Sequence, residues 1–154
     1  MRRIDSSIKR SRIYEETLQK LGGQGETLFP TLREALSFAA LIGFNERRRL
    51  PLDPRAGTED IASGQYQLNQ AVDIVLAIAL AETESTDIFK PTNEKDCVVI
   101  FEEYANGGLQ LIQEWFEDHA DSTSEDALWK GLKSIGFTSP EINQEEPQVV
   151  EPSF

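Results

Sequence analysis

The chain has 154 residues, 39% hydrophobic and 27% charged, which suffices for one domain with a single sizeable core. This composition excludes a collagen-like or wholly disordered protein. No apolar run approaches the roughly 18 residues of a membrane span, and the N-terminus lacks the apolar segment of a secretory signal. A single cysteine, Cys97, and a single histidine, His119, exclude an internal disulfide and the usual zinc sites. We therefore expect a cytoplasmic protein without membrane contact.

The net charge of −12 is unevenly distributed along the chain. Residues 1–50 hold ten Lys and Arg against six Asp and Glu, a net +4, whereas residues 51–154 hold five against 21, a net −16. Because duplex DNA is a dense polyanion, it repels so acidic a protein at long range. Any DNA contact would therefore come from the N-terminal third. In the simpler interpretation, the acidic excess only keeps the protein soluble and monomeric.

Two helices are predicted in the N-terminal third. The first covers about Ser6–Leu21, has a sparse apolar stripe, and ends at Gly22-Gly23, where a helix C-terminus favours glycine. The second begins at Thr31, which can form a capping box with Glu34. This helix is apolar nearly all round, so we expect it to be buried and central.

Three further helices are predicted after a loop that contains proline and glycine. One covers about Tyr66–Thr83, with Leu68 among its inward residues. The longest covers roughly Glu94–Asp118, and a short one follows the cap at Thr123 and stops at Gly136. The longest helix is indicated by a heptad-type stripe of residues spaced three and four apart: Val98, Phe101, Ala105, Gly108, Ile112 and Trp115.

These elements predict an all-α fold, a single compact domain of about five helices around one long central helix. We expect a basic N-terminal helix and turn in residues 1–28 and a helical core domain in residues 29–136. Residues 137–154 contain four acids and no basic residue, which predicts an acidic disordered tail.

The residue inventory argues against an enzyme. If Cys97 and His119 lie on one helix, they are about 33 Å apart, too far to act as nucleophile and base. No lysine has an acid two residues before it, the spacing used by a common class of metal-dependent nuclease. We interpret Cys97 as a small buried hydrophobe and His119 as a helix-end residue. No catalytic residue, metal site, cofactor or small-molecule substrate is expected.

The run Arg47-Arg48-Arg49, after the second helix, is the first candidate site. Guanidinium groups bind phosphate or carboxylate in a bidentate manner, which favours contact with DNA or with an acidic partner. The alternative is structural, because cations at a helix C-terminus are stabilised by the helix dipole. One arginine suffices for that role, so we assign partner or phosphate contact to one or two of the three.

The second candidate site is the middle of the long helix, with Glu102, Glu103, Tyr104, Asn106, Gly107 and Gly108. A glycine within a helix costs about 0.8–1 kcal/mol relative to alanine, so two in succession need a reason. Gly108 lies on the buried stripe, where it permits close approach of another backbone, whereas Gly107 lies off that stripe. The segment is either a helix-packing surface or an interaction surface for a ligand or partner helix. We favour internal packing.

Much of residues 29–112 consists of three distinctive segments: FPTLREALSFAALIGFNERRRLPL (29–52), IALAET (78–83) and IFEEYANGGLQLI (100–112). These segments resemble the dnd system-associated protein 4 family, also called DNA phosphorothioation-associated protein 4. The resemblance implies a small bacterial protein that acts beside the machinery exchanging a backbone phosphate oxygen for sulfur in DNA, or beside the linked restriction system of phage defence. It implies no catalytic residues.

The sequence therefore predicts a non-catalytic accessory or adaptor protein of a dnd-type DNA modification-restriction system. It would bind another protein component of that system through the long helix and Arg47–Arg49. The alternative is a direct DNA-binding accessory, in which residues 2–12 and 47–49 contact phosphates.

Overall fold

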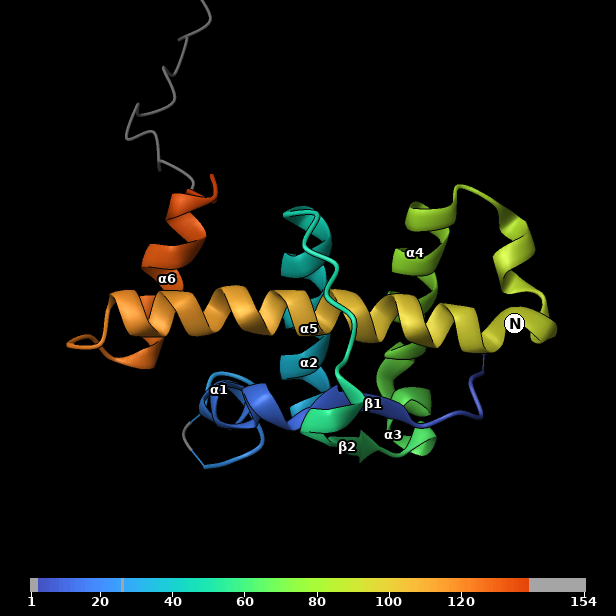
Figure 1. Cartoon of the computed structure of the whole chain (residues 1–154), viewed down its shortest axis with the longest axis horizontal. Helices are drawn as coiled ribbons and strands as arrows, with labels where there is room; N and C mark the ends of the chain where they lie inside the picture. The colour runs from blue at the N-terminus through green and yellow to red at the C-terminus, as the bar shows by residue number, and fades with distance from the viewer. Residues whose placement is uncertain (1–2, 26, 139–154) are drawn as a thin grey trace, which may run out of the picture.

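The computed structural model describes residues 3–25 and 27–138, so the predicted acidic tail lies outside the described residues from residue 139 onward. Helix α5 (Glu94–Asp118) forms the long axis of the molecule (Figure 1). Helices α2 (Leu32–Asn45) and α4 (Val72–Thr83) lie across it, and α6 (Ser124–Ser134) packs near its C-terminal end. The fold is mostly helical, as predicted, but it also contains a small two-stranded sheet.

The predictions for α5, α2 and α6 are confirmed. Helix α5 has the predicted bounds, and every residue of its heptad-type stripe is buried. Thr31 caps α2, since its hydroxyl accepts a hydrogen bond from the Glu34 amide at 3.1 Å while the Glu34 carboxylate accepts one from the Thr31 amide at 3.3 Å. Thr123 caps α6, since its hydroxyl accepts a hydrogen bond from the Asp126 amide at 3.1 Å. Local capping and periodicity thus determine these three helices.

Helices α2 and α5 cross with their backbones in direct contact, and three glycines make this possible. A Cβ atom added to Gly108 would lie 1.8 Å from the Ala39 carbonyl oxygen, and one added to Gly43 would lie 2.0 Å from the Tyr104 carbonyl oxygen. No side chain larger than hydrogen fits at either position without moving a helix.

Gly107, which was predicted to lie off the buried stripe, packs at the same crossing. A Cβ atom added to Gly107 would lie 1.8 Å from the carbonyl oxygen of Arg48, in the segment that follows α2. The sequence pattern indicated one buried stripe on α5, the heptad-type stripe that includes Gly108. The structure buries a second, neighbouring stripe against the end of α2.

The predicted helix over Ser6–Leu21 is wrong in its first half. The chain forms strand β1 (Ile8–Ser11), a 3-10 turn η1 (Arg12–Tyr14) and only then helix α1 (Glu15–Leu21). The Ser11 hydroxyl caps the turn by accepting a hydrogen bond from the Ile13 amide at 3.3 Å. Ile13 is 54% exposed, whereas Arg10, Ser11 and Tyr14 are buried in the strand and the turn.

Strand β1 is held between a second strand and the side of α5. It pairs antiparallel with β2 (Thr58–Ile61), with Ile8 opposite Ile61. The Lys9 amide donates a hydrogen bond to the Glu102 carboxylate of α5. Each strand has four residues, so tertiary contacts with α5 rather than local β-propensity account for the sheet.

The predicted helix over Tyr66–Thr83 is interrupted. Helix α3 (Ser63–Gln67) ends early, a 3-10 turn η3 (Leu68–Gln70) follows with Gln70 at φ +61°, and α4 begins at Val72. The interruption lets Tyr66 pack edge-on against Phe101 of α5, with ring centroids 5.7 Å apart. Leu68, predicted to face inward, is 53% exposed.

The two connecting loops contain short 3-10 turns. The first loop contains η2 (Pro54–Ala56), and the predicted polar connector after α4 contains η4 (Thr86–Phe89) and η5 (Pro91–Asn93). Within residues 3–25 and 27–138, no helix has the length and apolar character needed to cross a membrane.

We expect Gly108→Ala to lower the free energy of unfolding by about 3 kcal/mol, at the upper end of overpacking effects, because the added methyl group would overlap the Ala39 carbonyl. Gly64→Ala in α3 is the matched control, since nothing lies within 4 Å of its added Cβ. Its stability should be unchanged or higher by up to about 1 kcal/mol. Urea unfolding of both variants measures the difference, and equal stabilities would contradict the crossing.

Candidate functional site

The three arginines occupy the turn that carries the chain from α2 onto α5. Arg47 adopts a left-handed conformation at φ +54°, and the Arg48 amide donates a 2.8 Å hydrogen bond to the Gly43 carbonyl. This arrangement satisfies a carbonyl at the end of α2 and turns the chain sharply. The Leu50 amide then donates to the Glu103 carbonyl at 3.0 Å, which fixes the segment along α5.

Arg48 and Arg49 are bound to carboxylates of the same molecule. Arg48 Nη1 lies 2.9 Å from Glu114 Oε1. Arg49 Nε lies 2.7 Å from Glu103 Oε2, and its Nη1 lies 3.1 Å from Glu82 Oε1. Helices α4 and α5 therefore provide the anions that the arginine run was predicted to find in a partner or in DNA.

Arg47 is the most open of the three. Its side chain is 70% exposed, its Nη1 lies 3.9 Å from Glu82 Oε2, and its guanidinium carbon lies 4.8 Å from the centroid of the Phe44 ring. At that distance and exposure the ion pair is weak and screened by water. Of the predicted contact residues, Arg47 is the one that a partner could reach without displacing a short internal ion pair.

Tyr104 completes this arginine cluster, by which we mean Arg47, Arg48, Arg49, Glu82, Glu103, Tyr104 and Glu114. The Tyr104 hydroxyl donates a hydrogen bond to Glu82, and its ring packs edge-on against Phe44 with centroids 5.3 Å apart. Three guanidinium groups meet three carboxylates, so the cluster is close to neutral and gives a polyanion no net attraction.

The remaining residues of the predicted α5 site pack internally. Asn106 Nδ2 donates to the carbonyls of Leu50 and Pro51 at 3.1 and 3.3 Å, which anchors the loop that leaves the arginine cluster. Gly107 and Gly108 contact the backbone of α2 and of its following turn. The segment therefore places two loops and a helix relative to α5.

Glu102 is the exception, because it is buried without a cation bound to it. Its side chain is 8% exposed, and Oε2 accepts the hydrogen bond from the Lys9 amide. Burial raises the pKa of Glu102 to about 7, and the nearby carboxylates of Asp60 and Glu103 act in the same direction. The Lys9 amide and ammonium oppose this shift only in part.

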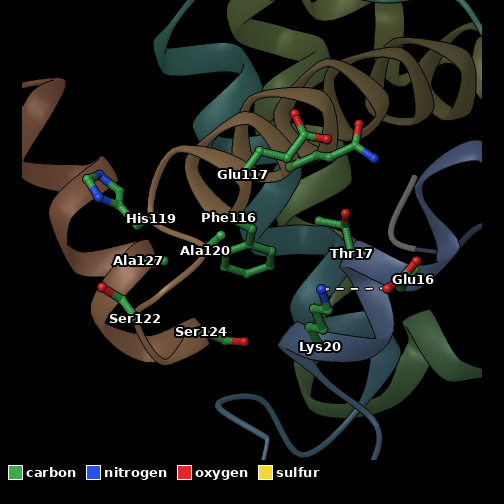
Figure 2. A pocket seen from close by; sticks show the side chains of 11 residues that line it. Glu16, Thr17, Lys20, Phe116, Glu117, His119, Ala120, Ser122, Ser124 and Ala127 are labelled. Atoms are coloured by element: carbon green, nitrogen blue, oxygen red, sulfur yellow. Dashed lines mark ion pairs between the residues drawn. The ribbon is translucent and has the colours of Figure 1, made fainter.

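A polar pocket elsewhere, between α1, the end of α5 and the start of α6, contains the single histidine (Figure 2). His119 lies at the end of α5, where its amide donates to the Trp115 carbonyl at 3.1 Å. Ser122 Oγ accepts a hydrogen bond from Lys130 Nζ at 3.1 Å, and Lys20 Nζ lies 3.6 Å from Glu16 Oε1. Among the described residues, no serine hydroxyl is hydrogen-bonded to the His119 ring, so the pocket shows no Ser-His pair. Within the described residues, no three His, Cys, Asp or Glu side chains form a potential metal site.

Residues 7–146 match the family described as DNA sulphur modification system-associated protein 4. The chain belongs to this family. It is therefore associated with a DNA sulphur modification system, in agreement with the resemblance of the three sequence segments. Comparison with curated proteins and with solved structures finds no significant match.

Sequence reasoning missed the acidic partners of the arginines. A usable signal was present on α5, where Glu103, Gly107, Gln110 and Glu114 follow one another at spacings of 4, 3 and 4. This spacing places them on one face of a helix. A polar row of this kind on one helix face, together with a run of three arginines elsewhere, indicates that the two segments pack together through ion pairs.

Replacement of Arg49 by glutamine should lower the free energy of unfolding by about 1 kcal/mol, since Glu82 and Glu103 lose their shared cation. The side chain is 35% exposed, so solvent screening limits the effect. Arg55→Gln, on the exposed 3-10 turn η2, is the matched control and should leave stability unchanged. Thermal unfolding at low and high salt measures both. An equal effect of the two replacements would exclude a stabilising cluster.

The raised pKa of Glu102 predicts a pH-dependent contribution to stability. Between its ordinary value of 4.5 and about 7, the native state holds a proton that the unfolded state releases. This contribution is complete below pH 4.5 and is lost as the pH rises through 7.

Glu102→Gln, which keeps an acceptor for the Lys9 amide, should therefore gain stability relative to the natural protein as the pH rises. Urea unfolding of both proteins from about pH 5 to about pH 8 measures this gain. A difference that stays constant with pH would show that Glu102 ionises normally.

Proposed function

We propose that the protein is a non-catalytic accessory that binds a protein component of the DNA sulphur modification system, or of the restriction system linked to it. The observation that carries this proposal is the internal neutralisation of the basic N-terminal third. Every described Lys and Arg in residues 3–50 except Lys9 lies within 3.9 Å of a carboxylate of the same chain.

This pairing supports a protein partner over DNA. A phosphate would have to displace Glu103 from Arg49 at 2.7 Å, or Glu59 from Arg12 at 2.9 Å. The remaining surface carries the acidic excess of a chain with net charge −12, which attracts basic protein surfaces and repels nucleic acid. A partner that works on DNA would place the protein in the cytoplasm.

The proposal is tested by co-expression of the tagged protein with each other component of the system, followed by purification in the presence of nuclease. We expect one component to co-purify in constant proportion. Because Arg47 is the accessible member of the arginine cluster, Arg47→Glu should weaken that association by about tenfold or more. Lys133→Glu makes the same charge change at an exposed position of α6 and should have no effect.

Direct DNA binding makes a different prediction. If residues 47–49 contact phosphate, each charge removed should reduce the slope of log affinity against log salt by about 0.9. We expect no salt-dependent affinity for duplex DNA and no difference between the natural protein and Arg47→Gln in fluorescence anisotropy. A component whose recovery is lost with nuclease, together with a changed slope, would overturn the proposed function.

A further inference from the structure

A second pocket lies where the loop after the arginine cluster passes over α5 and β1. Its volume is about 420 Å³. Its lining residues come from β1, the loop, the start of β2 and α5: Lys9, Pro51, Leu52, Pro54, Gly57, Thr58, Val99, Glu102 and Glu103. Apolar walls with a few polar groups are typical of a binding site for a ligand or a side chain.

Glu102 is one of the residues that line this pocket. Its side chain is nine-tenths buried, and Oε2 accepts the Lys9 amide. Oε1 accepts no hydrogen bond from any residue in the described part of the chain. A buried carboxylate that faces a pocket with one free oxygen is stabilised by a cation placed there.

The walls suit an aliphatic chain. They comprise Pro51, Leu52, Pro54 and Val99, and Val99 is 41% exposed at the surface. The loop is held in place because Asn106 binds two of its carbonyls, and Asp53 caps η2 with a 2.9 Å hydrogen bond from the Arg55 amide. The pocket is therefore formed before anything binds, which lowers the cost of binding.

The charges around the pocket leave Glu102 without a close cation. Glu103 is occupied by Arg49 at 2.7 Å, and Lys9, although it lines the pocket, forms no ion pair with Glu102 within the described residues. Asp60 adds a further negative charge nearby. A second cation entering the pocket is attracted to Glu102 and Asp60 and opposed by Lys9, whereas Arg12 and Arg49 beside the pocket are each paired with a glutamate.

We propose that this pocket receives a lysine or arginine side chain of the protein partner, with its aliphatic stem along the proline-rich wall and its charged group at Glu102. Lysine and arginine commonly bury their stems against apolar surface while their charged ends bind acids. The acidic chain as a whole, at net charge −12, steers such a basic partner toward this face. The inference rests on the proposed function, because it assigns one contact within the partner interface.

The test is a titration of the full-length, ¹⁵N-labelled protein with Nα-acetyl-lysine methylamide, followed by amide NMR. The natural protein should show saturable shifts at the non-proline residues of 51–58 and at residues 99–103. The neutral analogue Nα-acetyl-norleucine methylamide should bind roughly tenfold more weakly, because it lacks the charged hydrogen bond. Equal binding of the two probes, or shifts that spread over the surface without saturation, would overturn the proposal.

Variants locate the contact. Glu102→Gln should lower the affinity for the lysine probe roughly tenfold. Glu117→Gln, the same change at an exposed position of α5, should leave that affinity unchanged. Val99→Trp, at an exposed position of the pocket, should prevent the probe from entering without changing the packing of the core. It therefore tests the site even if the Glu102 variant folds poorly. Unchanged affinity in both pocket variants would exclude this site.

The two proposals can fail separately. A component that co-purifies equally with the natural protein and with Glu102→Gln would overturn the pocket assignment and leave the proposed function standing. A component that co-purifies with Glu117→Gln but not with Glu102→Gln or Val99→Trp would support both the proposed function and the pocket assignment.

Discussion

The structure depends on a contact between two helix backbones. At the crossing of α2 and α5, Gly43 and Gly108 face each other, and Gly107 faces the carbonyl of Arg48 in the turn that follows α2. Because no Cβ atoms separate the backbones, the end of α2 lies directly on α5, and the next residues of the chain must run along it. The position of the arginine cluster and of the loop beyond it is a consequence of this crossing.

Helix α5 uses that placement to bind the N-terminal third of the chain through its acids. Glu94 accepts hydrogen bonds from the Asp5 amide at 2.7 Å and the Ser6 hydroxyl at 2.8 Å, and Glu102 accepts the Lys9 amide. On another face, Glu103 and Glu114 bind arginines. The basic excess of residues 1–50 and part of the acidic excess of residues 51–154 are thus two sides of one set of internal contacts.

The sequence was sufficient for elements that local rules determine, and insufficient for those that depend on distant residues. The capping box at Thr31 and the heptad-type stripe of α5 are local, and both were predicted correctly. Strand β1 forms because β2, some fifty residues away, and Glu102 satisfy its backbone, and neither is visible in a window of local sequence. For the site, the arginine run and the Glu102–Gly108 segment were identified from sequence. The contact between these two segments was not predicted. The close approach at Gly107 was not predicted, because its packing partner is a backbone carbonyl, which no residue pattern encodes.

Two consecutive glutamates of α5 show how this fold separates structure from recognition. Successive helical residues point about 100° apart, so Glu102 and Glu103 enter different surroundings. Glu103 meets Arg49 at the loop and is neutralised there, whereas Glu102 enters a buried site where a backbone amide alone binds it. A hydrogen bond from a neutral amide offsets only part of the cost of burying a carboxylate, so the pKa of Glu102 rises to about 7. Glu102 is therefore a buried carboxylate without an ion pair among the described residues, and it lines a pocket with apolar residues on an acidic molecule. These three conditions are the basis for proposing a basic side chain as its partner.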